Sequence, residues 1–82
     1  MALRVTARLA HRLLMIAEGY GELDAPRRVL QLPQEQLASM LSLSRQTTNQ
    51  ILKDLQAQGV IGLGYGEIEI LDAERLRALA TI

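Results

Sequence analysis

One segment of this chain, residues 45 to 57, has two opposite faces if it is helical. At 100° per residue, the apolar side spans an arc of about 100° and carries Thr48, Ile51, Leu52 and Leu55. The other side carries long side chains that form hydrogen bonds: Arg45, Gln46, Asn49, Gln50 and Lys53. Such a helix buries one face in a core and presents donors and acceptors on the other.

A shorter helix is predicted directly before this segment. Apolar residues recur on one side of residues 34 to 41, at Leu37, Ala38 and Leu41. Pro33 suits the first turn of this helix, because the first N–H groups of a helix have no partner within it and proline has none to lose. A tight turn then separates the two helices, which is typical of a helix-turn-helix.

The ends of the longer helix carry suitable capping residues. Ser44 is a good N-cap, because its hydroxyl can accept from an unpaired N–H of the first turn. Gly59 suits the position after the helix, where glycine takes positive φ without a Cβ clash. Residues 60 to 63 and 67 to 70 then resemble two strands joined by a glycine-rich turn, which predicts a hairpin.

Flanking segments complete the predicted order of elements. Residues 3 to 18 are predicted as a helix with one apolar stripe and a separate stripe of Arg4, Arg8 and Arg12. The arginine stripe could contact phosphates or a neighbouring domain, and its default interpretation is a solvated surface. Residues 19 to 27 are predicted as a loop, and residues 28 to 32 partly alternate as a short strand would. Asp72 caps a short last helix.

Composition narrows the class of protein. The 82 residues suit one domain, and with no Phe or Trp its core must be aliphatic. The absence of cysteine excludes disulfides, thiolate zinc sites and cysteine nucleophiles. No apolar run reaches the ~20 residues that span a bilayer, and we expect a soluble, cytoplasmic protein. The formal net charge is zero, whereas an isolated DNA-binding domain is usually basic.

This order of elements predicts an α+β fold, a winged helix-turn-helix with three core helices and a small antiparallel sheet as the wing. The major groove of B-DNA admits one α-helix, in which Arg suits guanine and Asn or Gln suits adenine. Such residues fill the first half of helix 45 to 57, the part that usually reaches the bases. A polar helix face can also be an ordinary solvated surface, but the turn, the N-cap and the hairpin together favour DNA binding.

Residues 37 to 49, LASMLSLSRQTTN, resemble the helix-turn-helix of cyclic-AMP-receptor-type (Crp/Fnr) transcription regulators, whose pattern runs L-A-x-x-L-G-x-S-R-E-T-V. The resemblance keeps its spacing through residues 51 to 55, 59 to 61 and 68 to 72, and it covers most of the chain from residue 4 to residue 79. It implies sequence-specific binding of double-stranded DNA in transcription regulation, with helix 45 to 57 in the major groove.

The resemblance also implies roles for individual residues. Arg45 would read a guanine, and positions 46 and 50 would complete the recognition of bases. Base contacts are therefore expected from Arg45, Gln46, Asn49 and Gln50. Phosphate contacts are expected from Gln34, where the backbone would contribute, and from Ser44, Thr47, Lys53 and Tyr65.

Several positions depart from the family pattern. The Glu and Arg usual at positions 46 and 50 are both glutamine, which predicts a different base preference. Ser42 replaces the turn glycine and is strained if that position needs positive φ. Thr48 replaces valine, so its hydroxyl needs a partner or a partly wet position. Tyr65 stands in the wing where basic residues are common, which weakens the expected phosphate binding by the wing.

We expect residues 1 to 82 to be one domain of a longer regulator, with the helix-turn-helix at about 33 to 58 and the wing at about 60 to 70. The resemblance implies a homodimeric parent with an N-terminal cyclic-nucleotide-binding-like sensor domain, and RNA polymerase as a further partner. The alternative is a winged-helix protein-interaction module without DNA binding. No catalytic activity, cofactor or metal site is expected; His11 lacks a second histidine or a suitably spaced carboxylate.

Overall fold

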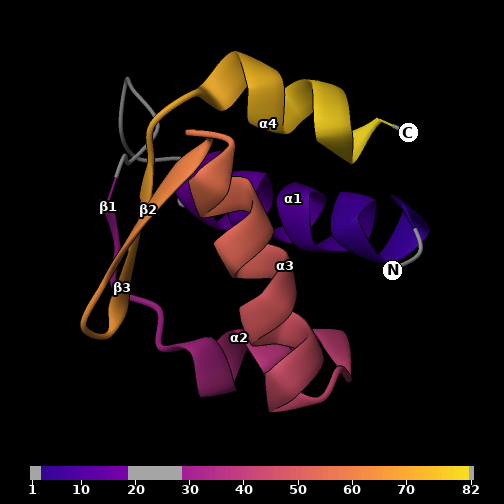
Figure 1. Ribbon diagram of the computed structural model, residues 1–82, viewed down its shortest axis with the longest axis vertical. Coiled ribbons are helices and arrows are strands. Elements are labelled where there is room, and N and C mark those ends of the chain that lie inside the picture. Colours follow the sequence, from indigo (N-terminus) through magenta and orange to yellow (C-terminus); the bar gives the residue numbers. More distant parts are fainter. Residues whose placement is uncertain (1–2, 19–28, 82) are drawn as a thin grey trace.

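The computed structural model describes residues 3–18 and 29–81 of the chain. These residues form α1 (Leu3–Glu18), β1 (Val29–Leu30), α2 (Gln34–Leu41), α3 (Arg45–Ala57), β2 (Ile61–Gly64), β3 (Glu67–Ile70) and α4 (Ala73–Ala80). In Figure 1, α1 and α4 lie side by side, α3 runs from them to α2, and the sheet flanks the helices. This is the predicted winged helix-turn-helix fold.

Most predicted bounds agree with the observed elements. Helices 3–18, 34–41 and 45–57 are found as expected, while the first hairpin strand is shifted by one residue to Ile61–Gly64. The predicted strand at 28–32 is shorter, Val29–Leu30, and residue 28 and the predicted loop at 19–27 lie outside the described residues. Pro33 is not inside the first turn of α2: it precedes the helix, and its carbonyl accepts from Gln36 and Leu37 at 3.0 and 3.2 Å.

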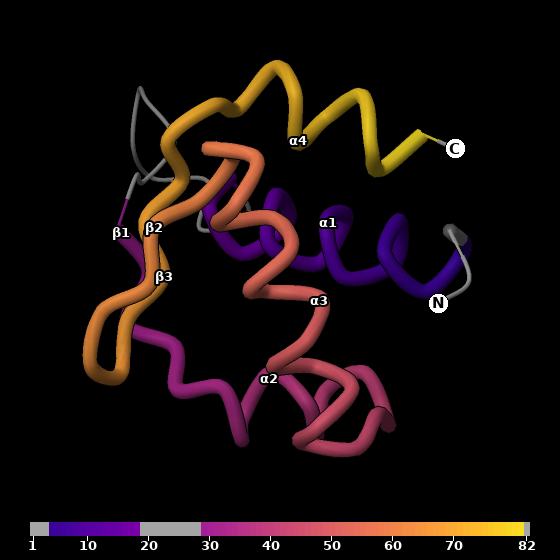
Figure 2. The backbone as a smooth tube through the Cα atoms, in the orientation of Figure 1, coloured from indigo at the N-terminus to yellow at the C-terminus, as the bar shows by residue number. Residues whose placement is uncertain are grey.

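The three strands form an antiparallel sheet in the order β1-β3-β2. Along β3, Ile68 and Ile70 are buried while Glu69 between them is exposed, as the alternation predicts. The hairpin turn contains Gly66 at φ 69°, a conformation that L side chains rarely adopt. The chain path in Figure 2 shows this turn projecting toward the end of the molecule where α2 lies.

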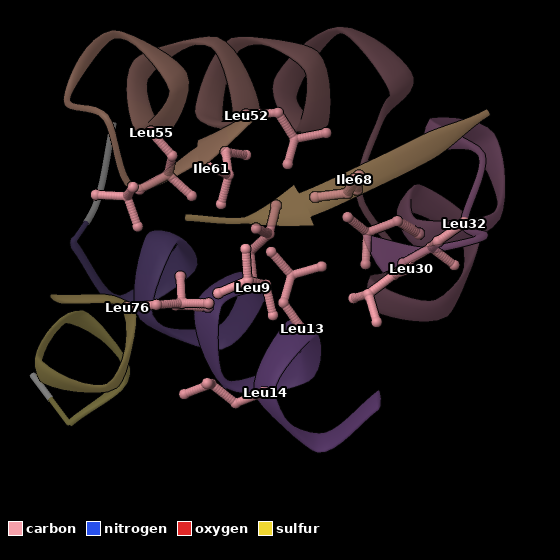
Figure 3. Close-up of a cluster of buried hydrophobic side chains, with 14 of the residues drawn as sticks. Leu9, Leu13, Leu14, Leu30, Leu32, Leu52, Leu55, Ile61, Ile68 and Leu76 are labelled. Atoms are coloured by element: carbon pink, nitrogen blue, oxygen red, sulfur yellow. The ribbon is translucent and has the colours of Figure 1, made fainter. Parts of the chain in front are cut away.

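An aliphatic core joins the helices to the sheet, as the composition requires. Figure 3 shows side chains from α1, α3, α4 and the strands pointing toward one another, among them Leu9, Leu13, Leu52, Ile68 and Leu76. All five are completely buried. Removal of this apolar surface from water is the main force that holds α3 against the rest of the domain.

Arg8, in the arginine stripe of α1, is exposed as expected, and it also contacts a neighbouring helix. The Arg8 guanidinium donates from Nη2 to the carbonyl of Leu41, the last residue of α2, at 3.0 Å. A cation at this end is favourable because the last carbonyls of a helix carry partial negative charge. Arg8 therefore attaches α2, and with it the helix-turn-helix, to α1.

The turn between α2 and α3 contains a residue in the left-handed backbone conformation. Ser42 has φ 56° and ψ 40°, and the N–H of the next residue, Leu43, donates to Ala38 at 2.9 Å. The expected strain at this serine is confirmed, since a non-glycine residue in this region is disfavoured. Ser44 then begins α3 as predicted: its Oγ accepts from the N–H of Thr47 at 3.0 Å.

Thr48 departs from the expectation that its hydroxyl is paired or partly wet. The residue is completely buried, and among the described residues its Oγ1 has no hydrogen-bond partner. A buried polar group without a partner costs about 1–3 kcal/mol. The family's valine would fill the same space without this cost, so Thr48 lowers the stability of the inner face of α3.

Candidate nucleic-acid interface

The outer face of α3 presents polar side chains to solvent along its whole length. Arg45, Gln46, Gln50 and Lys53 are exposed, and Asn49 is half-buried. The inner face of the same helix is closed off in the core, with Ile51, Leu52 and Leu55 at 1% exposure or less. The two faces that the sequence predicts are therefore both present, and the outer one is free to meet a ligand.

Arg45, the first residue of α3, forms an ion pair across the turn. Its Nη1 donates to the Glu35 carboxylate on α2 at 2.8 Å, and the two side chains remain 74% and 70% exposed. Exposed pairs of this kind contribute about 0–1 kcal/mol. The guanidinium is therefore oriented by Glu35 but can be released at small cost.

Asn49 makes a parallel contact one turn further along α3. Its Nδ2 donates to Oε1 of Gln34, the first residue of α2, at 2.8 Å. Two of the four expected base-contacting side chains are thus held by neighbouring residues of the first turn of α2. Gln34 is one of the predicted site residues, but its hydrogen bond with Asn49 leaves no signal in the local sequence.

The hydroxyls at the start of α3 are hydrogen-bonded to each other. Ser44 Oγ accepts from the N–H of Thr47 and donates to Thr47 Oγ1 at 2.9 Å. Ser44 is exposed and Thr47 is half-buried. Both lie where the positive end of the α3 dipole would attract a phosphate, but their side chains first serve to cap the helix.

An open groove of about 870 Å³ separates the start of α3 from the wing. Its lining unites residues from both sides: Leu32, Pro33, Gln34, Glu35, Arg45, Gln46, Asn49, Gly64, Tyr65, Gly66 and Glu67. Five of the nine predicted site residues meet here, namely Gln34, Arg45, Gln46, Asn49 and Tyr65. Gln50 and Lys53 continue the same helix face beyond the groove, and Ser44 and Thr47 lie at its α3 end without lining it.

Tyr65 stands at the tip of the wing. The side chain is fully exposed and lies between Gly64 and Gly66 in the hairpin turn. A phenol can donate one hydrogen bond and can pack its ring against a sugar. It cannot supply the charge that a basic wing residue would.

Two carboxylates in this groove were not among the predicted site residues. Glu35 pairs with Arg45, and Glu67 on β3 accepts from Nε2 of Gln31 at 3.1 Å. Glu67 lines the groove because of how the wing packs against the helices, which no local periodicity records.

Other site classes find no support in the described part of the chain. Over residues 3–18 and 29–81, no three His, Asp or Glu side chains are grouped as a metal ion would need, and His11 is exposed on α1. No helix found within those residues is long and apolar enough to cross a membrane.

Comparison of the sequence with known proteins tests the resemblance. The model of the Crp-like helix-turn-helix domain matches residues 7–79. A CRP-like cAMP-activated global transcriptional regulator of Mycobacterium tuberculosis is 38% identical over 74 residues, which cover 88% of this chain and 33% of the relative. The transcriptional regulator SdrP of Thermus thermophilus is 31% identical over 78 residues, covering 94% and 39%. The chain thus spans little more than a third of the length of these curated relatives.

Solved structures agree with the sequence matches. A CRP/FNR-family transcriptional regulator of Thermus thermophilus superposes with a TM-score of 0.84 at 30% identity, covering 96% of this chain and 41% of its own. The reduced CO-sensing protein of R. rubrum superposes with a TM-score of 0.78 at 28% identity, covering 95% and 38%. The chain therefore belongs to the Crp-like helix-turn-helix domain family, which occurs in transcription regulators of the CRP/FNR family.

Proposed function

We propose that the domain reads double-stranded DNA with α3 in the major groove. The observation that supports this is the outer face of α3, whose first two turns hold Arg45, Gln46, Asn49 and Gln50. The first three of these line the groove beside the wing. Arg can bind guanine O6 and N7, and Asn and Gln can bind adenine N6 and N7. These four residues contact bases in the proposed complex.

Phosphates on either side of the major groove are contacted by a second set of residues. The first residues of α2 and α3 line the groove, and helix N-termini favour anions. Lys53 lies further along the exposed face of α3, and Tyr65 reaches out from the wing. The proposed phosphate contacts are Gln34, Ser44, Thr47, Lys53 and Tyr65.

The proposed domain, residues 1 to 82, works within a longer homodimeric regulator in the cytoplasm. The matched relatives are longer than this chain, and their names describe activation by cAMP or sensing of CO. An N-terminal sensor domain would couple a small ligand to the spacing of two such DNA-binding domains, and RNA polymerase would be contacted at the promoter. DNA binding, without catalysis, is the proposed activity of the domain itself.

A protein-docking winged helix is the alternative, and the character of the α3 face decides between the two. An acidic or apolar face would favour a protein partner. The observed face carries Arg45 and Lys53 among three amides and has no large exposed apolar side chain. This favours DNA.

Selection from random duplexes tests the proposal. The domain is fused to a dimerising helix, and bound duplexes are sequenced. We expect mirrored half-sites whose centres lie about 34 Å apart, one helical turn of DNA. Enrichment of single, unpaired half-sites would contradict the dimeric arrangement, and no enrichment at all would overturn DNA reading by this face.

The isolated chain is expected to bind DNA weakly. From residue 33 to residue 59 the charges of Arg45 and Lys53 are balanced by Glu35 and Asp54, so the segment has a formal charge of zero. Few phosphates are neutralised, and the salt dependence is shallow. We expect a non-specific Kd no tighter than about 10⁻⁵ M at physiological salt. A nanomolar Kd of the monomer in a fluorescence-anisotropy titration would contradict this.

A further inference from the structure

Two side chains of α3 that the proposed function assigns to bases already donate hydrogen bonds to residues in the first turn of α2. Glu35 accepts from Arg45, and Gln34 accepts from Asn49, both at 2.8 Å. In the free domain, Glu35 and Gln34 accept the hydrogen bonds that base edges would accept in the complex. DNA must therefore exchange a contact with α2 for a contact with a base at two positions of α3.

The charge of the groove makes this exchange selective. Its lining holds one cation, Arg45, and two carboxylates, Glu35 and Glu67, so its formal charge is 1 − 2 = −1. A phosphate that approaches Arg45 meets the repulsion of the Glu35 carboxylate as well. The acceptor edge of a guanine carries no net charge, so the carboxylate repels it less strongly than it repels a phosphate.

We propose that Glu35 is a specificity-determining residue, which reduces the attraction of Arg45 for phosphates more than its attraction for guanine. This inference rests on the proposed function. Because the pair is exposed on both sides, Glu35 does not lock Arg45. It weakens random backbone contacts, which supply most of the non-specific binding of DNA.

Glu35→Gln tests the role of this carboxylate, and Glu74→Gln is its matched control. Both substitutions remove one negative charge from an exposed glutamate in the first turn of a helix, on α2 and α4 respectively. Glu74 is not part of the groove lining. Any general effect of net charge on DNA binding therefore appears in both variants.

The chain is titrated against two duplexes of equal length, one with the selected half-site and one scrambled. We expect Glu35→Gln to strengthen binding to the scrambled duplex more than to the half-site, lowering the ratio of the two affinities by about twofold to fivefold. Glu74→Gln should leave the ratio unchanged. In an Arg45→Ala background, Glu35→Gln should change both affinities by the same factor.

The other possible outcomes contradict either the role of Glu35 or the proposed function itself. An unchanged ratio in Glu35→Gln, or an equal fall in Glu74→Gln, overturns the role of Glu35. A ratio that falls because half-site binding weakens shows that Glu35 supports Arg45 at the guanine, which also contradicts the proposal. If the unmodified chain does not prefer its half-site, the proposed function itself fails.

Discussion

The two faces of α3 differ in how strongly their contacts hold. On the inner face, Ile51, Leu52 and Leu55 are buried, and each buried side chain of this size contributes about 1.5–3 kcal/mol. On the outer face, the Arg45–Glu35 pair is largely exposed and contributes about 0–1 kcal/mol. The inner contacts therefore determine the fold, while the outer ones are weak enough to be exchanged for DNA.

Thr48 is an exception to this difference between the faces, because it places a polar group on the inner face. Its hydroxyl is buried without a partner among the described residues, whereas the exposed Arg45 and the half-buried Asn49 are paired. Burial, and not polarity alone, decides the cost of a polar side chain. Substitutions on the inner face should therefore change the stability of the domain, and substitutions on the outer face should change DNA binding.

Leu52→Ala should have the largest effect on stability. Leu52 is completely buried, and truncation of such a residue costs about 2–5 kcal/mol. We expect a large fall in Tm, measured by circular dichroism, and loss of DNA binding with loss of the fold. The exposed Gln50→Ala is the control on the same helix and should stay within about 0.5 kcal/mol of the parent. If Leu52→Ala and Gln50→Ala destabilise the domain equally, the two faces of α3 do not differ in their contribution to stability.

Arg45→Ala should act on binding without acting on the fold. A bidentate contact of arginine with guanine is worth about 1–3 kcal/mol of discrimination. We expect the selected site to lose its preference for that guanine, and overall affinity to fall because a charge is lost. Competition titrations with guanine-substituted duplexes measure this. A folded Arg45→Ala variant that binds as tightly and selectively as the parent would contradict the assignment.

Thr48→Val should stabilise the domain by about 1 kcal/mol, because it removes the unpaired buried hydroxyl and keeps the shape of the side chain. For a domain of this size the expected rise in Tm is about 4–8 °C. Thr47→Val is the matched control: Thr47 Oγ1 accepts from Ser44, so the same substitution there should give no gain. A fall in the Tm of Thr48→Val would show that the hydroxyl is satisfied.

Ser42→Gly should have the smallest effect, a gain of at most about 1 kcal/mol, because relief of the left-handed cost of roughly 1–2 kcal/mol is partly offset by the freedom that glycine gains in the unfolded chain. Ser42 has φ 56°, where glycine avoids the Cβ clash. Ser39→Gly within α2 is the control and should cost about 0.5–1 kcal/mol. Urea unfolding compares the two. If both variants lose stability equally, the turn at Ser42 is not strained.

Much of the outer face of α3 could be predicted, because the helical period determines which side of a helix each residue occupies. The outer face of α3 follows from its period, and Ser44 and Gly59 take their expected capping roles, with Gly59 at φ 77°. The pairing of Glu35 with Arg45 could not be read in the same way. The two residues are ten positions apart across a turn, and their contact depends on how α2 crosses α3.

The sequence by itself determined the helices, the hairpin, the aliphatic core and the donor-rich face of α3, because each depends on side chains close together in the chain. The tertiary structure alone decided what those side chains meet. It brought the Arg8 guanidinium to the end of α2, buried the Thr48 hydroxyl, and placed Glu35 and Glu67 in one groove with Arg45. Such contacts arise from the packing of whole elements against a shared core, and local periodicity carries no record of them.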